Sequence, residues 1–519
     1  MDGLQPASEP QSRDPTLLAV MRGYAARTPD APCVTFGDET SSFAELDTRS
    51  DRLAGLLEQS GVGPGDRVAI LSHNSPVFYE LFFACAKIAA IMMPLNWRLS
   101  AREITSILAD GEPQLILASA ELEHLLPADP APTILLGQEF EDRLSATSPG
   151  DLRPDPDPAS AGVLLYTSGT TGQPKGVVLS HRALSFSARI APHAWDFDSA
   201  SVNLVGMPLF HIGGIGYGMM ALTQGGQTVL LREAEPALIL AAINRHRVTH
   251  AFFVPTVIQR LVEAVEQGAP PPRSLKLIVY GAAPIGEALL RRALAAFGCG
   301  FSHAYGMTES AGTIVSLHAR DHDPDGPQAA RLRSCGRPFP WVEIALVDPS
   351  TGRRVADGEI GEILIRSPMI MTGYWRKKAE TEAVLTSDGW FHSGDAAVRD
   401  ADGFLYIRDR YKDMIVSGGE NIYPAEIEHV LQAHPSIAEV VVIGIPHAQW
   451  GETPRACVVV GPGETPDEAA LIAFARDQLA RYKCPTSVRF MDSFPRNASG
   501  KILKHELRAL AAQEQETQS

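Results

Sequence analysis

A segment rich in glycine, serine and threonine, residues 167–176, has the composition of a loop that binds an anion. It reads Thr-Ser-Gly-Thr-Thr-Gly-Gln-Pro-Lys-Gly, and apolar residues flank it on both sides. Backbone N–H groups and hydroxyls of such a loop can converge on a phosphate. A long hairpin turn is the alternative, but a turn needs only one or two glycines and none of these hydroxyls. The spacing G-x-x-x-x-G-K-[ST] is missing, which disfavours a P-loop kinase or nucleoside triphosphatase.

Four charged residues outside this loop are of types that could bind a nucleotide. Glu309 comes directly after a threonine, and a carboxylate beside a hydroxyl suits Mg²⁺; a solvated acid at a helix end is the alternative. Asp395 follows a serine and a glycine and could equally cap its own turn. Taken alone, Arg410 would be a surface ion-pair partner and Lys501 a solvated charge. Residue type by itself therefore leaves these roles open.

Two glycine-containing apolar segments could let a ligand approach the backbone closely. Residues 208–220 contain four glycines and His211, and residues 280–284 read Tyr-Gly-Ala-Ala-Pro. Small residues leave room for a flat base or an acyl group. An unplaced histidine is more often a hydrogen-bonded core residue, and 280–284 also fits a strand followed by a turn. The glycine spacing does not match G-x-G-x-x-G, so hydride transfer with a dinucleotide is disfavoured.

The overall composition is that of a folded protein with an acidic surface. The chain has 519 residues, 45% of them apolar and 20% charged, and 45 Lys+Arg against 61 Asp+Glu give a net charge of −16. A surface with this balance repels a nucleic-acid backbone, so we expect no nucleic-acid partner. The six cysteines are widely spaced and never form C-x-x-C, which argues against a zinc knuckle and a disulfide framework.

No targeting or membrane segment is visible in the sequence. Residues 1–16 are polar and lack a basic segment followed by an apolar one, so no secretory signal is expected. The most apolar region, 81–95, contains Lys87 and falls short of the ~18 residues of a membrane helix. We therefore expect a buried helix there and no integral membrane segment. The chain does not end in Ser-Lys-Leu, and a cytoplasmic location is the expectation.

Alternation of short apolar runs with longer helical patterns predicts the elements that position these residues. Such alternation is typical of α/β layers with parallel strands. The predicted strand and helix pairs are 67–71 with 76–90, 228–231 with 236–246, and 275–279 with 285–297. Short strands from about residue 336 predict a small antiparallel subdomain, and an α+β pattern after Lys412 predicts a second domain. The corresponding elements are strands 343–347, 362–365 and 404–407, then helix 424–433, strands 438–443 and 456–460, helix 467–481 and strand 487–490.

The segment 166–176 resembles the signature of the acyl-adenylate-forming superfamily, which includes acyl-CoA synthetases, firefly luciferase and the adenylation domains of peptide synthetases. Five further segments resemble motifs of that superfamily and occur in the same order, so that the resemblance covers residues 16–510. These segments are 280–284, 305–309, 390–395, 409–428 and 495–501. The resemblance implies a large N-terminal domain, residues 1–411, of layered α/β subdomains and a small antiparallel β subdomain. A small mobile α+β C-terminal domain, residues 412–519, would follow.

The resemblance also implies a role for each motif residue. Lys501 would be catalytic together with Thr170 and Glu309, and Glu309 would ligate Mg²⁺. Tyr305 would lie along the adenine face, and Asp395 would accept hydrogen bonds from both ribose hydroxyls with Arg410 assisting. Lys412 would be the hinge, and Gly418 and Gly419 would lie on the CoA path. The residues implied in ATP and AMP binding are Thr167, Ser168, Gly169, Thr170, Thr171, Gly172, Lys175, Gly281, Ala282, Ala283, Tyr305, Gly306, Thr308, Asp395, Arg410 and Lys501. The residues implied in the acyl pocket are His211, Gly214, Val254, Tyr280, Gly306 and Met307.

The reaction implied by the resemblance has two steps. A carboxylic acid, expected to be a fatty or related hydrophobic acid, reacts with Mg²⁺ and ATP to give acyl-AMP and pyrophosphate. The thiol of CoA then displaces AMP. Only residues 502–519 follow Lys501, so we expect no fused carrier-protein domain, which favours CoA as acceptor.

Three alternatives stay open at this point. A stand-alone adenylating enzyme could load a separate carrier protein or stop at acyl-AMP. An aryl-acid–CoA ligase is a second alternative, although residues 361–367 read Gly-Glu-Ile-Leu-Ile-Arg-Ser where coumarate-type ligases have Gly-Glu-Ile-Cys-Ile-Arg-Gly. A binding module whose catalysis has lapsed is the third. The sequence does not define the acid, and it leaves a homodimer open.

Overall fold

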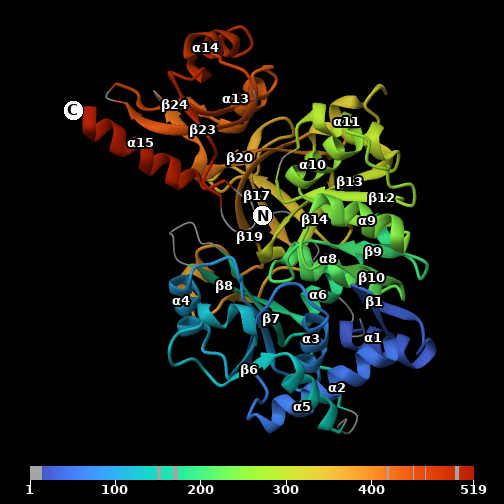
Figure 1. The fold of residues 1–519 in the computed structure, drawn as a ribbon. Helices are drawn as coiled ribbons and strands as arrows, with labels where there is room; N and C mark the ends of the chain where they lie inside the picture. The colour runs from blue at the N-terminus through green and yellow to red at the C-terminus, as the bar shows by residue number, and fades with distance from the viewer. Residues whose placement is uncertain are drawn as a thin grey trace. The chain divides into compact units, whose positions relative to one another are not determined.

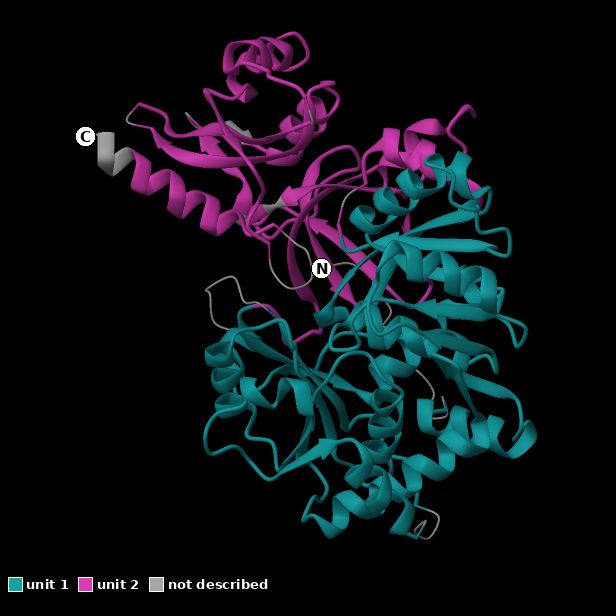
Figure 2. Ribbon diagram, viewed as in Figure 1, with its two compact units in different colours: residues 1–282, 294–319, 367–383 teal, residues 283–293, 320–366, 384–519 magenta. Residues whose placement is uncertain are grey.

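The computed structural model describes residues 15–148, 153–167, 174–283, 285–417, 420–447, 449–461, 463–496 and 502–518. The chain divides into two compact units, shown in two colours in Figure 2. Unit 1 comprises residues 1–282, 294–319 and 367–383, and unit 2 comprises residues 283–293, 320–366 and 384–519. Residue 412 lies within unit 2 and at no boundary between the two units, so the hinge expected there stays a prediction.

The first sheet of unit 1 carries the hairpin of the predicted phosphate loop. Its strand order is β18-β8-β7-β4-β3-β5-β6, and the strands from β7 to β6 run parallel (Figure 1). The antiparallel pair of β7 and β8 places Thr167 opposite Lys175. The strands are β3 (Arg67–Leu71), β4 (Ile91–Pro94), β5 (Leu115–Ser119), β6 (Thr133–Leu136), β7 (Ala161–Thr167), β8 (Lys175–Ser180) and β18 (Gly373–Tyr374).

The second sheet of unit 1 aligns three predicted site segments along one edge. Its strands run in the order β14-β13-β12-β11-β9-β10-β1-β2, and those from β13 to β1 are parallel. Val254, Ala282 and Thr308 directly follow three adjacent strands, β11, β12 and β13, and the carboxyl edge of parallel strands is where α/β proteins bind ligands. The strands are β1 (Pro32–Phe36), β2 (Glu39–Ser42), β9 (Val202–Val205), β10 (Gln227–Leu230), β11 (His250–Phe253), β12 (Leu277–Gly281), β13 (Gly300–Met307) and β14 (Gly312–Leu317).

Several helices of unit 1 start at side-chain caps. Ser42 and Ser100 each form a capping box with the glutamate three residues later, which satisfies backbone N–H groups that a helix start leaves free. The helices are α1 (Leu17–Arg27), α2 (Phe43–Gln59), α3 (Val77–Lys87), α4 (Ala101–Gly111), α5 (Gln138–Ala146), α6 (His181–Ala188), α7 (Ile190–Ala194), α8 (Ile212–Leu222), α9 (Pro236–His246), α10 (Pro255–Glu266) and α12 (Lys378–Glu382); α11 (Glu287–Phe297) belongs partly to each unit.

The sequence predicted one buried helix over the apolar region 81–95, and this prediction is wrong. Helix α3 ends at Lys87, Ala89 has a φ of 55°, and β4 begins at Ile91. The left-handed backbone at Ala89 ends the helical path and turns the chain into the sheet. The ammonium of Lys87 is fully buried and lies 2.6 Å from Asp47 and 2.8 Å from Asp51, which compensates its charge. No helix among the described residues is long and apolar enough to cross a bilayer.

Buried His181, the first residue of α6, predicts a pH-dependent stability. Burial lowers the pKa of His181 from 6.5 to about 4. The unfolded chain binds this proton more readily, so stability that is fully present above pH 6.5 falls as the pH drops toward 4, by up to about 3 kcal/mol. His181→Gln should flatten this part of the pH dependence of the free energy of unfolding, measured by urea denaturation. The same change at exposed His429 should leave the pH dependence of the free energy of unfolding unaltered. The same pH dependence in the wild-type protein and in both variants would refute the role of His181.

Unit 2 contains the small antiparallel sheet that the sequence predicts and the C-terminal α+β element. The antiparallel sheet has the order β16-β17-β19-β20. The strands of unit 2 are β15 (Arg337–Pro338), β16 (Glu343–Val347), β17 (Ile360–Arg366), β19 (Phe391–Arg399), β20 (Leu405–Arg410), β21 (Ile415–Ser417), β22 (Glu420–Ile422), β23 (Ile437–His447), β24 (Gly451–Val460) and β25 (Ser487–Met491).

The C-terminal sheet of unit 2 is covered by helices on both faces (Figure 1). Because side chains alternate along a strand, Val440 and Val442 of β23 pack with α13 (Pro424–Gln432) and α14 (Glu468–Arg476), whereas Val441 and Ile443 pack with α15 (Lys504–Gln518). The predicted elements are present here. The helix predicted over 467–481, however, ends at Arg476, and the two strands are longer than predicted.

Candidate active site

The turn after β13 places Glu309 beside a tyrosine from a distant segment. Residues 308–310 form one 3₁₀ turn, after which the chain reverses into β14. The hydroxyl of Tyr374 donates a hydrogen bond to Oε1 of Glu309 at 3.0 Å, and the backbone N–H of Met371 donates to the carbonyl of Glu309 at 2.8 Å. The carboxylate of Glu309 is half-buried and has a fixed orientation.

Tyr374 also contacts the lysine of the predicted phosphate loop. Nζ of Lys175 lies 4.9 Å from the centroid of the Tyr374 ring, a cation–π distance. Strand β18 places Tyr374 opposite Val177 of β8, two residues after Lys175. Lys175 and Glu309 therefore both contact one tyrosine, Lys175 at the ring and Glu309 at the hydroxyl. The sequence analysis missed Tyr374, because a two-residue strand is too short to show an alternating pattern.

The neighbouring strands β12 and β13 hold the predicted adenine and acyl residues in register. Tyr280 lies opposite His303, and their rings stack with centroids 4.9 Å apart. A Cβ on Gly306 would lie 1.9 Å from the carbonyl oxygen of Gly312, so only glycine fits this strand pair. Tyr305 is half-buried next to it, while Ala282 is exposed after β12. These residues lie on two adjacent strands near the carboxyl edge of the sheet, and their individual contacts with a ligand stay predictions.

His211 caps the start of α8. Its Nδ1 accepts a hydrogen bond from the backbone N–H of Gly213 at 3.1 Å, and burial lowers the pKa of His211 to about 4. A neutral imidazole at this helix start avoids placing a positive charge at the positive end of the helix dipole. A Cβ on Gly214 would lie 2.0 Å from the carbonyl oxygen of Pro208. Close packing against the backbone therefore requires glycine at position 214.

Two buried hydrogen-bonding groups beside α8 have no partner within the described chain. They are the hydroxyl of Tyr217 and the indole N–H of Trp195, whose rings lie 5.8 Å apart. The Tyr217 ring also packs against Phe197 and Phe252, at 6.1 and 5.4 Å. An unpaired buried donor costs about 1–3 kcal/mol. These two groups are therefore suited to a bound polar atom.

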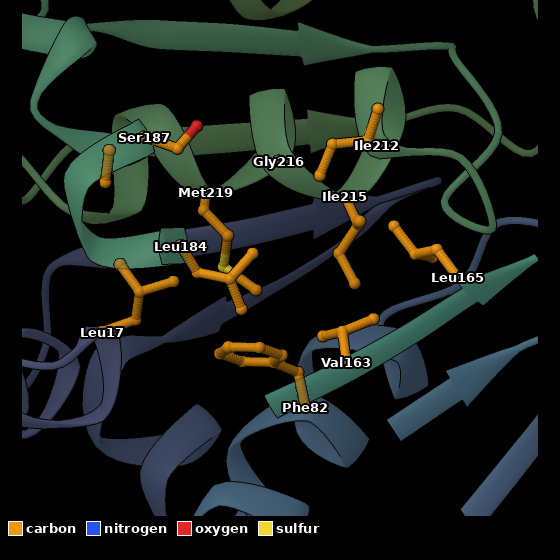
Figure 3. A pocket seen from close by; sticks show the side chains of 11 residues that line it. Leu17, Phe82, Val163, Leu165, Leu184, Ser187, Ile212, Ile215, Gly216 and Met219 are labelled. Atoms are coloured by element: carbon orange, nitrogen blue, oxygen red, sulfur yellow. The ribbon is translucent and has the colours of Figure 1, made fainter. Parts of the chain in front are cut away.

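A small apolar pocket lies beside α8 (Figure 3). Ile212, Ile215, Gly216 and Met219 line it at helical spacing, and side chains from α1, α3, β7 and α6 close it. Its open volume is about 10 Å³, roughly the space of one water molecule. The pocket is thus too small to hold an acyl chain.

In unit 2, the predicted ribose residues Asp395 and Arg410 are direct cross-strand neighbours. They face each other in the antiparallel pair of β19 and β20, and Asp395 is buried. Glu362 of β17, which no motif in the sequence marks, anchors the part of β19 that precedes Asp395. It accepts a hydrogen bond from the backbone N–H of Gly394 at 3.1 Å, and its other oxygen lies 3.0 Å from the ring of His392. An isolated glutamate in a strand gives no sequence signal for such a role.

The remaining predicted residues are not placed. The side chains of Arg410 and Lys412 lie outside the described part of the chain. Outside it altogether are Ser168, Gly169, Thr170, Thr171, Gly172, Gly418, Gly419 and Lys501. Their roles stay predictions.

The residues present fit a Mg²⁺ ion that is bound jointly by a protein carboxylate and the phosphates of a nucleotide. Among the described residues, no group of three or more His, Cys, Asp or Glu side chains could hold a metal. Mg²⁺ typically keeps several waters and takes one or two carboxylates plus substrate phosphates, and not an all-protein cage. The single oriented carboxylate of Glu309 meets that requirement.

Comparisons with known proteins define the family of the chain. Residues 21–375 match the family described as AMP-binding enzyme, and residues 426–501 match the AMP-binding enzyme C-terminal domain. A fatty acid–[acyl-carrier-protein] ligase of Streptomyces coeruleorubidus is 39% identical, over 95% of this chain and 96% of that protein. A feruloyl-CoA synthase of an Amycolatopsis species is also 39% identical, over 93% and 96%.

Two solved structures show the same fold with ligands bound. ATP-bound MatB of Rhodopseudomonas palustris is 30% identical and superposes with a TM-score of 0.87, over 95% of this chain and 98% of that one. The o-succinylbenzoate CoA synthetase of Bacillus subtilis in complex with ATP and magnesium is 32% identical, with a TM-score of 0.83, over 94% and 98%. The chain belongs to the AMP-binding enzyme family, within the acyl-adenylate-forming superfamily. It is an AMP-forming acid–thiol ligase.

Proposed function

We propose that the chain is an ATP-dependent acyl-CoA synthetase that activates a hydrophobic carboxylic acid. The acid and ATP give acyl-AMP and pyrophosphate, and the thiol of CoA then takes the acyl group and releases AMP. The main support for this proposal is the contact of Tyr374 with both Lys175 and Glu309. It joins the phosphate-loop hairpin to the carboxyl edge of the second sheet through a hydrogen bond of 3.0 Å and a ring contact of 4.9 Å.

The chain's own residues bind and position in this reaction, because the nucleophiles are the substrate carboxylate and then a thiol. Lys175 and the loop before it bind phosphate oxygens, and Glu309 with Thr308 holds Mg²⁺ on the nucleotide. The ion, when bound, neutralises phosphate charge. Lys501 stabilises the charge that accumulates where the carboxylate meets the α-phosphate.

The test of this proposal is acid-dependent pyrophosphate release from ATP. A panel of short, medium and long fatty acids, aryl acids and polycyclic acids is measured with and without CoA. We expect release with at least one hydrophobic acid, and AMP without ADP as the nucleotide product. Formation of ADP, or no release with any acid, would exclude an adenylating enzyme.

Asp395→Ala should weaken ATP binding more than it slows turnover. A carboxylate that accepts hydrogen bonds from both ribose hydroxyls loses about 1.5–3 kcal/mol per bond, in the ground state and the transition state alike. The KM for ATP should therefore rise about tenfold or more in steady-state adenylation assays, with a smaller fall in kcat. Asp357→Ala, which removes an exposed carboxylate paired with Arg399, is the matched control. An unchanged KM in the Asp395 variant would exclude the ribose role.

A second candidate substrate class is an aryl acid with a polar substituent at its far end. The unpaired groups of Tyr217 and Trp195 favour it, because they lie in an aromatic cluster that includes Tyr217 of α8, the helix capped by His211. An oxygen substituent on a ring would satisfy both groups while the ring stacks among the aromatic side chains. An alkyl chain would leave them unpaired.

Tyr217→Phe tests the aryl candidate. We expect the preference of kcat/KM for an oxygen-substituted aryl acid over its unsubstituted parent to fall about two- to tenfold, since one neutral hydrogen bond is lost. Tyr79→Phe is the matched control, because the buried hydroxyl of Tyr79 on α3 also has no partner. The same loss in both variants, or no loss in the Tyr217 variant, would contradict a contact with the substrate.

A cytoplasmic location stays part of the proposal. The six cysteines are all free, as expected in a reducing compartment. A homodimer, which the sequence leaves open, would double the mass measured by light scattering.

A further inference from the structure

Asp409, near the end of β20, contacts two elements that follow it in the chain. Its Oδ2 accepts a hydrogen bond from the backbone N–H of Ala425, in the first turn of α13, at 3.1 Å. The same oxygen lies 3.9 Å from Nζ of Lys504 at the start of α15. The Asp409 side chain is only 10% exposed, so little solvent screens these contacts.

Lys504 contacts elements that follow residue 412 in the chain. Its Nζ lies 2.9 Å from Oε1 of Glu428 on α13, and the same oxygen accepts a hydrogen bond from the backbone N–H of Val442 in β23 at 2.8 Å. Burial alone would lower the pKa of Lys504, but the carboxylates of Glu428 and Asp409 raise it. Lys504 is thus a charged group fixed between α13, α15 and β23, and Asp409 is its partner from β20.

Asp409 and its contact partners lie on opposite sides of the proposed hinge residue in the sequence. Asp409 precedes Lys412, whereas Ala425 and Lys504 follow it. A rotation about the torsions of residue 412 would separate Asp409 from both partners. The ion pair between Asp413 and Arg508, 2.8 Å long, lies wholly after the hinge and would move as one piece.

We infer that Asp409 and Lys504 are positioning residues that stabilise one of the two working orientations of the C-terminal domain. This inference rests on the proposed function, because each half-reaction must use its own orientation. A contact made in only one state shifts the equilibrium toward that state. Lys504 is three residues after Lys501, so the contact also fixes the helix that follows the catalytic loop.

The experiment measures both half-reactions in the full-length enzyme. Acid-dependent exchange of pyrophosphate into ATP reports adenylation, and thioester yield from preformed acyl-AMP and CoA reports transfer. Asp409→Ala should change the ratio of the two rates about three- to tenfold, with one rate falling and the other held or raised. Lys504→Met should change the ratio in the same direction. Asp413→Ala should leave the ratio unchanged, although it also removes an ion pair from a partly buried carboxylate.

The outcomes separate this inference from the proposals on which it rests. Equal losses in both half-reactions for Asp409→Ala and Lys504→Met, or a ratio that Asp413→Ala shifts as strongly, would overturn the positioning role and indicate a purely structural one. A wild-type enzyme without pyrophosphate exchange would instead overturn the proposed function. A shifted ratio in Asp409→Ala together with a fully active Lys412→Pro would support the contact and move the hinge away from residue 412.

Discussion

Lys501→Ala is expected to lower the rate of acyl-AMP formation about a hundred- to a thousandfold while leaving most of the thioester step intact. The ammonium acts where two anions meet, the carboxylate and the α-phosphate. Losing a group that stabilises charge only in the transition state costs ~3–4 kcal/mol. The second step expels AMP and has no such encounter. The rates are measured separately, as pyrophosphate exchange and as thioester formation from preformed acyl-AMP.

The control for this variant is Lys483→Ala. Lys483 lies in the same domain and pairs with Glu426 at 2.8 Å, so its removal changes the charge by the same amount without touching the loop. It should retain both rates within a few-fold. Equal loss of both half-reactions in the Lys501 variant would count against a role confined to adenylation.

Lys412→Pro should retain acyl-AMP formation and lose thioester formation. Both steps use one adenylate, yet Lys501 and Gly418 belong to the same small domain and are needed at different moments. A rotation about a short segment solves this conflict, because a few backbone torsions can absorb it. Proline fixes φ near about −65°, removes the amide donor and restricts Tyr411. The adenylating orientation survives if its φ at residue 412 is compatible with proline.

Lys412→Ala distinguishes a backbone effect from the loss of a charge. It should affect neither step appreciably, since alanine keeps the torsional freedom of the original residue. Pyrophosphate exchange and CoA-dependent thioester yield are measured for both variants. A proline variant that performs both steps at wild-type rates would refute a hinge at this residue.

The large α/β layers and the small antiparallel sheet could be predicted from sequence because their periodicity is local. The strand 343–347 and the helix 236–246 have the predicted bounds. The change from helix to strand within 81–95 could not be predicted, because it depends on the left-handed backbone of Ala89. Alanine gives no sequence signal for that conformation. A continuous apolar run fits a buried helix and a buried strand equally well.

Motifs in the sequence name candidate site residues, whereas contacts between distant segments leave no signal along the chain. Asp395 and Arg410 are neighbours in the sheet, as their shared role implies. Tyr374 lies 65 positions from Glu309 in the chain and has no motif of its own. Glu362 likewise contacts Gly394 of β19, 32 positions away in the chain. Such contacts follow from sheet pairing across the fold and not from spacing along the chain.

The identity of the acyl acceptor tests the account most directly. The wild-type enzyme is incubated with ATP, Mg²⁺, a hydrophobic acid that supports pyrophosphate release, and either CoA or an acyl-carrier protein with its phosphopantetheine arm. Products are identified by mass spectrometry and AMP is quantified. The account predicts acyl-CoA and AMP in equal amounts, with little or no acylated carrier. Acylated carrier protein without acyl-CoA, or acyl-AMP that accumulates in the presence of both thiols, would contradict it.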